Sequence, residues 1–434
     1  MSLRGDIIRE FQQLNLAMVS KLVRNVPILN SLEMSPAWNS RQQLWAGIHL
    51  TISGFSFRAA RAPNELSRVK ITIFGLTLSS SWGNGHATPY RALIRALDHL
   101  GHRVHFFEKD VPYYRSRRDF DSCGYCDLTL YSEWSDARRR ALAIAADSDV
   151  VITASFVPEG RRINDEILDL GRPLRVFYDL DTPVTLANLR QGEVEYLDAR
   201  QLAEFDLALS FTGGKVLAEL ENRYRAPMVR TLYGCVDPAE YYRVAPLGNF
   251  QCDLSYMGTY SADRQAKLDE LLLGPSRRHP EKTFLLAGSL YPWNWQWPEN
   301  VRRMEHVAPA EHACFYSSSR TTLNITRGEM AANGWCPSGR FFEAAACGTP
   351  LITDQWEGLD SFFHLGNELR VVSCAADVED AMNAPDAELQ SMAARARQRT
   401  LDEHTGTVRA RQLLQYFEEA RSGARASMKK EVAQ

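Results

Sequence analysis

Short apolar runs alternate with longer helical stretches from Val69 onward, and this alternation is the feature that most limits how the chain folds. Five of the runs have the length and the β-branched or aromatic residues of buried strands: KITIFGL, RVHFFE, DVVITAS, LRVFYDLD and DLALSFTGG. Helical periodicity lies between them, as in HATPYRALIRALDHLGH, which stops at Gly101. Strands separated by helices predict βαβ units, and therefore a parallel sheet covered on both faces.

A second series of strand-like runs follows the turn-rich segment VAPLGNFQ: CDLSYMG, TFLLAGSL, ACFYSSS, TTLNIT, TPLITD and LRVVS. Because single cores stop growing at about 250–300 residues, a chain of 434 residues is expected to hold two domains. The sequence therefore predicts an α/β protein with two Rossmann-like, doubly wound parallel sheets, over residues 68–246 and 247–408. Residues 1–67 are expected to form a helical extension. Residues 409–434 are expected to form a helix that returns to the first domain and ends in a frayed tail.

Composition and charge narrow the class of protein. The 50 Lys and Arg residues nearly balance the 53 Asp and Glu residues, so the net charge of −3 gives no reason to expect nucleic acid as the main partner. No run approaches the roughly 18–20 apolar residues of a membrane span, and the first residues lack the apolar core of a signal peptide. We therefore expect a cytoplasmic protein. Its CxxC pair, Cys123 and Cys126, lacks the partners of a zinc site and is expected to hold plain thiols.

Ligands of open parallel sheets bind outside the carboxyl ends of the strands, so the loops there are the first places to look for a site. In the first domain, the loop after KITIFGL provides the acceptor-side candidates Trp82, Gly83, Asn84 and Gly85. It enters the next helix at His86, whose ordinary pKa near 6.5 suits a general base at neutral pH. Asp181 in FYDLDTPVTLANL is the reserve for this role. The alternative roles are structural: His86 would only pack in the fold, and Asp181 would cap the following helix.

Two other loops belong to the second domain. In SYMGTYSADRQAKL, Gly258 and Tyr260 precede a helix that carries Arg264. Backbone N–H groups at a helix start, together with an arginine, suit a diphosphate, although Arg264 also has the option of pairing with a surface acid. The run PWNWQWPEN adds three tryptophans, which either stack on sugar or base faces or simply pack together.

The most informative segment is LNITRGEMAANGWCPSGRFFEAAACGTPLITD. Its basic, Gly-rich and aromatic loop leads to a helix that Ser338 is expected to cap. The residues singled out in this segment as ligand-binding are Arg327, Trp335, Ser338, Gly339, Arg340 and Glu343. Glu343 lies one to two turns into the helix, where a carboxylate reaches sugar hydroxyls beside a phosphate at the helix start. Complementing the helix dipole is the alternative role for Glu343.

These segments together resemble a known family. GRFFEAAACGTPLITDQWEGLDSFF closely resembles the C-terminal signature of the CgeB-like, group 1-type glycosyltransferases, named after spore maturation protein CgeB. TLNITRGEM, YMGTYSADRQ, AGSLYP and DEHTGTVRARQLL fit the same pattern, as do SWGNGHATPYRAL and YDLDTP, so the resemblance covers about residues 70–415. It implies the GT-B fold, in which two Rossmann-like domains face a central cleft. The nucleotide-sugar donor is then expected on the C-terminal domain and the acceptor mainly on the N-terminal one.

The resemblance also assigns roles to residues. In the family, the acid that matches Glu343 holds the donor ribose and the helix start holds the diphosphate; Gly288 of AGSLYP belongs to the same donor side. Arg264, Arg327 and Arg340 are expected to neutralise the leaving diphosphate. Catalysis in the family is metal-independent, so we expect no cofactor and a co-substrate such as a UDP- or dTDP-sugar. The acceptor is expected to be a small molecule, a glycan or a protein.

One position departs from the family pattern. Many retaining members carry two glutamates separated by seven residues, but Trp335 stands eight positions before Glu343. Glu329 is a spatial alternative to the missing acid, and both retention and inversion of the anomeric configuration stay open. The competing functions are a nucleotide-sugar epimerase or sugar-phosphate enzyme on the same fold, and an inactive glycan- or nucleotide-binding protein. The nucleotide base, the sugar and the oligomeric state also stay open.

Overall fold

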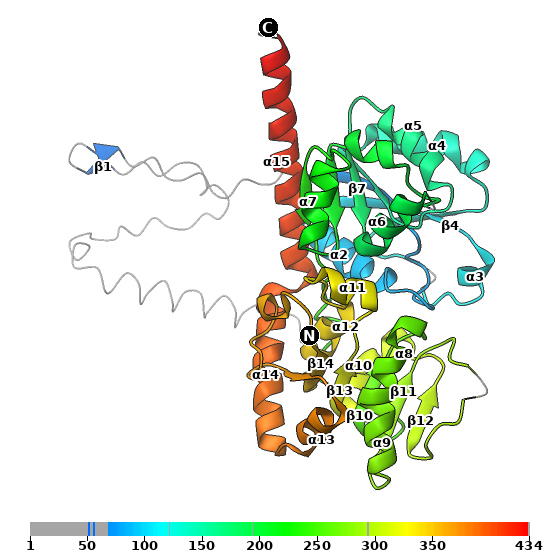
Figure 1. Ribbon diagram of the computed structural model, residues 1–434. Helices are drawn as coiled ribbons and strands as arrows, with labels where there is room; N and C mark the ends of the chain where they lie inside the picture. Colours follow the sequence, from blue (N-terminus) through cyan, green and yellow to red (C-terminus); the bar gives the residue numbers. More distant parts are fainter. Residues whose placement is uncertain are drawn as a thin grey trace, which may run out of the picture. The chain divides into compact units, whose positions relative to one another are not determined.

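Figure 1 shows the computed structural model, which describes residues 51–52, 55–56, 68–120, 122–192, 194–292 and 295–432. The chain divides into two units between residues 65 and 66. In the first unit, strands β1 (Thr51–Ile52) and β2 (Phe55–Ser56) pair antiparallel. The rest of the helical extension predicted over residues 1–67 lies outside the described residues. Both large sheets belong to the second unit.

Seven parallel strands form the first sheet, in the order β5-β4-β3-β6-β7-β8-β9. Their bounds are β3 (Lys70–Phe74), β4 (Arg103–Lys109), β5 (Asp127–Tyr131), β6 (Val150–Ala154), β7 (Leu174–Asp179), β8 (Leu207–Ser210) and β9 (Val229–Thr231). The five strands predicted in this region are all confirmed. The sequence did not predict β5, which is only partly buried at the sheet edge, or β9, which has only three residues. Neither of them carries the apolar run of a buried strand.

Helices connect the strands of the first sheet (Figure 1). They are α2 (Ala87–His99), α3 (Pro112–Arg115), α4 (Trp134–Asp147), α5 (Gly160–Leu168), α6 (Thr182–Gln191), the short turn η1 (Ala199–Ala203) and α7 (Lys215–Asn222). Helix α2 buries Tyr90, Leu93 and Leu97 at helical spacing, so its apolar stripe faces the core. The predicted stop is confirmed: α2 ends shortly before Gly101, whose φ of 88° suits glycine.

Six parallel strands form the second sheet, in the order β12-β11-β10-β13-β14-β15. Their bounds are β10 (Cys252–Met257), β11 (Phe284–Ala287), β12 (Val301–Met304), β13 (Ser319–Asn324), β14 (Leu351–Asp354) and β15 (Arg370–Val372). The strand predicted at ACFYSSS is wrong, because residues 313–318 lie in helix α10 (Pro309–Ser318). Phe315 and Tyr316 are fully buried there, and a buried helix shows the same short apolar run as a strand.

The remaining helices surround the second sheet and close the chain. They are α8 (Ala262–Leu268), α9 (Gly274–Arg278), α11 (Gly328–Asn333), α12 (Gly339–Ala346), α13 (Ala375–Asn383), α14 (Asp386–Glu403) and α15 (Gly406–Val432). Helix α15 packs against α2 of the first sheet, so closely that a Cβ on Gly406 would lie 2.4 Å from the carbonyl oxygen of Ala92 (Figure 1). It continues to Val432, so the tail expected to fray from Ala426 is helical over most of its length.

Two further predictions concern the cysteine pair and membrane-spanning helices. Cys123 and Cys126 form a disulfide, so the prediction of plain thiols is wrong. The turn between them brings their Cα atoms to 5.4 Å, within the usual range of a disulfide. Across the described ranges, none of the helices combines the length and the apolarity that a bilayer crossing requires.

Candidate functional site

A cavity of about 610 Å³ lies where loops of the two sheets meet. Its first-sheet half is formed by the lining residues from Leu76 to Phe211, and its second-sheet half by those from Met257 to Glu343. Both halves lie at the carboxyl ends of parallel strands, where ligands of such sheets bind. Most residues singled out from the sequence line the cavity: Gly83, Asn84, Gly85, His86, Asp181, Gly258, Tyr260, Arg264, Gly288, Arg327, Ser338, Gly339, Arg340 and Glu343.

A buried acid fixes the start of the loop between β3 and α2. Glu108, at the carboxyl end of β4, is 1% exposed and accepts hydrogen bonds from the backbone N–H groups of Leu78 and Ser79 at 2.7 and 2.9 Å. The hydroxyls of Thr77 and Ser79 donate to the same carboxylate. Because four donors share one buried carboxylate, the loop is held firmly before it reaches the cavity.

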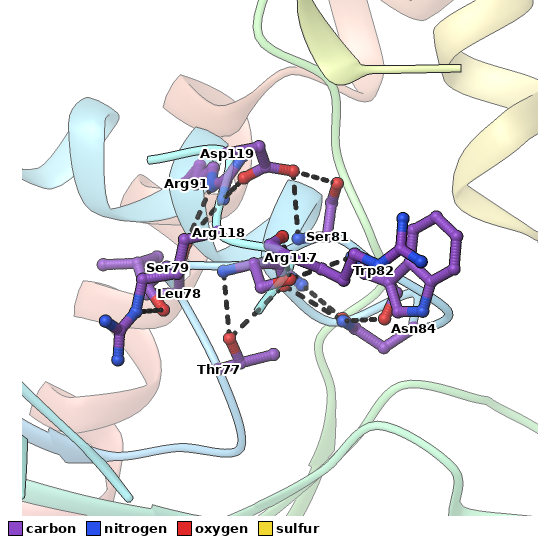
Figure 2. A network of polar contacts seen from close by, with 12 residues as sticks. Thr77, Leu78, Ser79, Ser81, Trp82, Asn84, Arg91, Arg117, Arg118 and Asp119 are labelled. Carbon is purple, nitrogen blue, oxygen red and sulfur yellow. Dashed lines mark hydrogen bonds and ion pairs between the residues drawn. The ribbon is translucent and has the colours of Figure 1, made fainter. Parts of the chain in front are cut away.

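Asp119 holds the next turn of the same loop (Figure 2). Its carboxylate accepts hydrogen bonds from the backbone N–H group and the hydroxyl of Ser81, and it pairs with Arg91 at 2.5 Å. Beside it, Arg117 lies over the indole of Trp82, 4.2 Å from the ring centroid. Trp82 is 8% exposed and is not among the cavity-lining residues. Its ring also packs on that of His306 in the cavity wall, with centroids 4.9 Å apart, so the acceptor-side role of Trp82 stays a prediction.

Asn84 caps helix α2. Its Oδ1 accepts hydrogen bonds from the backbone N–H groups of His86 and Ala87 at 3.0 and 3.2 Å. Its Nδ2 donates to the carbonyl oxygens of Ser80 and Trp82. Both ends of the amide are engaged within the protein, so Asn84 shapes the loop and places His86 at the mouth of the helix.

His86 and Asp181, which the sequence offered as alternative bases, form one pair. Nε2 of His86 lies 3.1 Å from Oδ2 of Asp181, and among the described residues Nδ1 has no hydrogen-bond partner. This contact favours the tautomer with the proton on Nε2, and the unshared lone pair then lies on the buried Nδ1. Burial alone would raise the pKa of Asp181. The hydrogen bond and charge of His86, together with the charge of Arg327, hold that pKa below its usual value.

A second aspartate supports the loop that carries this pair. The carboxylate of Asp179, at the end of β7, accepts hydrogen bonds from the backbone N–H group of Asp181 at 3.0 Å and from the hydroxyl of Thr185 at 2.9 Å. Asp179 is 3% exposed, and this burial raises its pKa to about 7, assisted by the charge of Asp181. Asp179 therefore orients the Asp181 loop from within the sheet.

Close approach of two strand ends shapes the second-sheet half. A Cβ on Gly288 would lie 2.0 Å from the carbonyl oxygen of Gly258, so only glycine fits between the turns after β10 and β11. Tyr260 extends from the same region into the cavity and packs edge-on against Trp295, with ring centroids 5.5 Å apart. Trp295 packs in turn on Trp297. The described part of the tryptophan run thus forms an aromatic cluster behind Tyr260.

Three arginines give the second-sheet half its positive charge: Arg264, Arg327 and Arg340. Arg264 donates to the carbonyl oxygen of Thr259, and its Nε has no hydrogen-bond partner within the described part of the chain. Burial and the neighbouring charge of Arg340 lower the pKa of Arg264. Arg327 is more open, with a side chain 41% exposed and 3.6 Å from Glu329. An anion in this half would meet cations whose charge the protein itself only partly compensates.

Helix α12 begins at the cavity wall. Ser338 has the extended backbone of an N-cap residue, but its side chain makes no capping hydrogen bond. Glu343, one turn further on, is 6% exposed and receives a hydrogen bond of 3.4 Å from the hydroxyl of Tyr316. Burial raises the pKa of Glu343 to about 7, although the charge of Arg340 opposes the shift. The helix start therefore offers free N–H groups beside a carboxyl group that lacks strong partners.

Trp335 does not line the cavity, although the sequence placed it in the donor pocket. Its carbonyl oxygen accepts a hydrogen bond from the N–H group of Gly213 at 3.0 Å, and its own backbone N–H group donates to the carbonyl oxygen of Glu357 at 2.7 Å. Its indole lies against Gly214 and Gly358, where a Cβ would come within 2.8 and 2.5 Å of the ring. Trp335 therefore joins the loop after β8 to the second-sheet elements.

The sequence did not point to several residues of the first-sheet half. Leu76, Tyr114, Phe156 and Phe211 line the cavity, and Phe156 has a φ of 63°, a conformation that bulky side chains rarely adopt. Apolar residues after strands look like core residues in a sequence, so no pattern could have found them. Glu108 did leave a signal, because an acid closes the predicted strand RVHFFE.

Part of the chain matches a known family. Residues 264–415 match the family described as glycosyl transferase-like. The match begins at Arg264 and includes the start of α12 with Glu343. Among curated proteins, none matches the sequence.

Solved structures share the architecture. Sucrose-phosphate synthase from Thermosynechococcus elongatus is 15% identical, with 82% of this chain and 100% of that chain covered and a TM-score of 0.59. An alpha-glucosyltransferase in complex with UDP-glucose and abasic-site DNA is 12% identical, with 81% and 100% covered and a TM-score of 0.61. Anabaena HepE in complex with UDP and glucose is 11% identical, with 81% and 100% covered and a TM-score of 0.56. These similarities confirm the predicted GT-B fold of two parallel-sheet α/β domains.

Proposed function

We propose that the protein is a glycosyltransferase that moves a sugar from a nucleoside diphosphate sugar to a hydroxyl or amine of an acceptor. The observation that carries the proposal is the division of one cavity, with arginines and a helix start on one half and a histidine–aspartate pair on the other. The glycosyl transferase-like match over residues 264–415 supports the transfer of a sugar. The UDP and UDP-glucose named for two similar structures favour a uridine nucleotide. The motif GRFFEAAACGTP, inside the matched residues, favours the CgeB-like members of the group.

The second-sheet half, within the proposed donor domain of residues 247–408, suits the diphosphate. Arg264 and Arg340 line it beside the uncapped start of α12. Preorganised N–H groups and guanidinium groups of this kind stabilise the charge that develops on a leaving diphosphate. Because Arg327 adds a third positive charge, we propose that transfer needs no metal ion.

Glu343 suits the donor ribose. Its carboxyl group lies at the cavity wall, and burial there raises its pKa, so the surrounding protein disfavours the charged form. A carboxylate that only complemented the helix dipole would be stabilised in the empty protein. Two ribose hydroxyls would instead donate hydrogen bonds to Glu343 and restore the charged form.

The first-sheet half, in the proposed acceptor domain of residues 68–246, suits proton removal. The pair of His86 and Asp181 would take the proton of the acceptor hydroxyl while the hydroxyl oxygen bonds to the anomeric carbon. The bond from that carbon to the diphosphate oxygen breaks, and its electron pair leaves with the nucleoside diphosphate. Asp181 would hold the imidazole in place and stabilise its protonated form.

Calorimetric titration of UDP in the presence of EDTA tests the proposal. We expect the wild-type protein to bind UDP, and Glu343→Gln to weaken binding by about 1.5–3 kcal/mol, or roughly ten- to a hundredfold. Absence of binding, or binding that appears only when Mg²⁺ is restored, would contradict the donor site as described. Equal affinities of the two proteins would remove the ribose role from Glu343.

A further inference from the structure

We infer that the acceptor is an uncharged molecule whose hydroxyl is attached to a flat apolar ring, an inference that rests on the proposed function. It concerns the first-sheet half of the cavity, which the donor does not need. Three independent features of that half agree: its charge, the state of its polar side chains and the backbone of Phe156.

Charge separates the two halves of the cavity. The described lining residues include three arginines, and all of them belong to the second-sheet half. In the first-sheet half the ionisable side chains are His86, Tyr114 and Asp181, and two of these already form a pair. A phosphorylated or otherwise anionic acceptor would therefore find no cation to bind it in this half, and it would face the carboxylate of Asp181.

Two polar side chains of the first-sheet half are already engaged. Ser81 donates to Asp119. Asn84 accepts from the N–H groups at the start of helix α2 through Oδ1 and donates to carbonyl oxygens of its own loop through Nδ2. A free sugar needs partners for several hydroxyl groups, and a site that leaves them unpaired discriminates against it. The pair of His86 and Asp181 is enough for a single acceptor hydroxyl.

Apolar side chains supply the rest of this surface. They are Leu76, Pro89, Phe156, Leu180 and Phe211, joined by the ring of Tyr114, and they come from the loops after β3, β6, β7 and β8 and from helices α2 and α3. Their convergence around His86 gives the proposed base an apolar surround that suits the face of a ring.

Phe156 is the residue most specifically placed for this contact. It follows β6 with a φ of 63°, where glycine or asparagine would sit without strain. Its ring packs edge-to-face on His86, with centroids 5.8 Å apart, and tilts on Tyr196 at 4.8 Å. The unfavourable backbone conformation places a phenyl ring beside the proposed base, so Phe156 is assigned as the residue that selects the acceptor ring.

Binding of three probes tests the inference: 2-naphthol, glucose and glucose 6-phosphate, each titrated with and without saturating UDP. We expect 2-naphthol to bind at least about tenfold more tightly than either sugar. Phe156→Gly should weaken naphthol binding by about tenfold and leave UDP affinity unchanged, with Phe156→Leu between the two. Arg225→Gly is the matched control, because Arg225 has a φ of 57° and does not line the cavity.

The outcomes separate this inference from the proposed function. Tighter binding of glucose or glucose 6-phosphate would overturn the inference, as would naphthol affinities that are the same in wild type and both Phe156 variants. If Phe156→Gly does not fold, the affinity of Phe156→Leu decides, and wild-type affinity would overturn the inference. If UDP did not bind but naphthol binding were intact, the result would contradict the proposed function and leave this inference standing.

Discussion

The two halves of the cavity solve different recognition problems. The second-sheet half gathers Arg264, Arg340 and the start of α12, all of which act on negative charge. The first-sheet half is lined mainly by apolar side chains around His86 and Asp181. Under the proposed function, charge would bind the diphosphate that every donor shares, whereas shape and apolar contact would select one particular acceptor. Generic binding and specificity would then lie on opposite walls of one cavity.

The largest effect is expected from removing the base on the first-sheet half. His86→Ala should lower turnover by about 10²–10⁴-fold, the usual contribution of a general base, and leave UDP affinity nearly unchanged. The backbone of the loop should survive, because Asn84 caps the backbone N–H group at position 86 and not the imidazole. Steady-state release of UDP from UDP-glucose, with a functioning acceptor, measures the change.

His99→Ala is the control for that variant, since His99 lies at the other end of α2 and does not line the cavity. Its turnover should stay close to wild type. If the two histidine variants lose turnover equally, the assignment of the base to the first-sheet half fails.

Arg264→Ala should separate diphosphate binding from nucleoside binding. Loss of a charge-assisted contact is expected to weaken UDP binding by roughly ten- to a hundredfold and to leave uridine binding unchanged. Arg327→Ala should have a smaller effect, because its side chain is 41% exposed and lies near Glu329. Calorimetric titration of UDP and of uridine into each variant measures these effects. If Arg264→Ala weakened the binding of both ligands equally, Arg264 would lie outside the diphosphate site.

A smaller effect, dependent on pH, should come from Glu343. If ribose binding needs the carboxylate and burial holds its pKa at about 7, affinity for UDP-glucose should fall about tenfold between pH 8 and pH 6. Glu343→Gln should bind weakly at both values. UDP-glucose is the suitable ligand, because its esterified diphosphate does not titrate in this range.

The empty protein provides an internal check on the same pKa. Because the folded state keeps the Glu343 proton to about pH 7 and the unfolded state loses it near 4.5, the free energy of unfolding should fall as pH rises through that window. Glu343→Gln should lose this contribution. A variant whose pH dependence of unfolding matches that of wild type would contradict the raised pKa.

The residues of the second-sheet half were easier to predict from the sequence than those of the first-sheet half, for a physical reason. Ser338, Arg340 and Glu343 lie within one helix start, where an N-cap, a cation and an acid have recognisable spacing. Phe156 and Phe211 converge from separate loops, and each alone looks like a core residue. The parallel sheets were predictable because buried strands such as β6 and β14 are apolar throughout.

Other residues depended on tertiary contacts that no local pattern carries. Trp335 lies between Gly214 and Gly358, which belong to distant parts of the chain, so its loop context suggested a pocket where the structure has a junction. His86 and Asp181 were predicted as alternative bases. They lie 95 positions apart in the sequence, and only the fold brings their side chains to 3.1 Å. The disulfide of Cys123 and Cys126 likewise follows from the turn that joins them.

The central claim is that the nucleotide occupies the second-sheet half and leaves the first-sheet half to the acceptor. Amide hydrogen exchange with and without UDP tests it directly, since bound ligand slows exchange of the N–H groups it contacts. We predict protection of the segment from Gly258 to Arg264 and of the α12 start from Ser338 to Glu343. Protection confined to the loop from Ser81 to His86, with none at α12, would contradict the account.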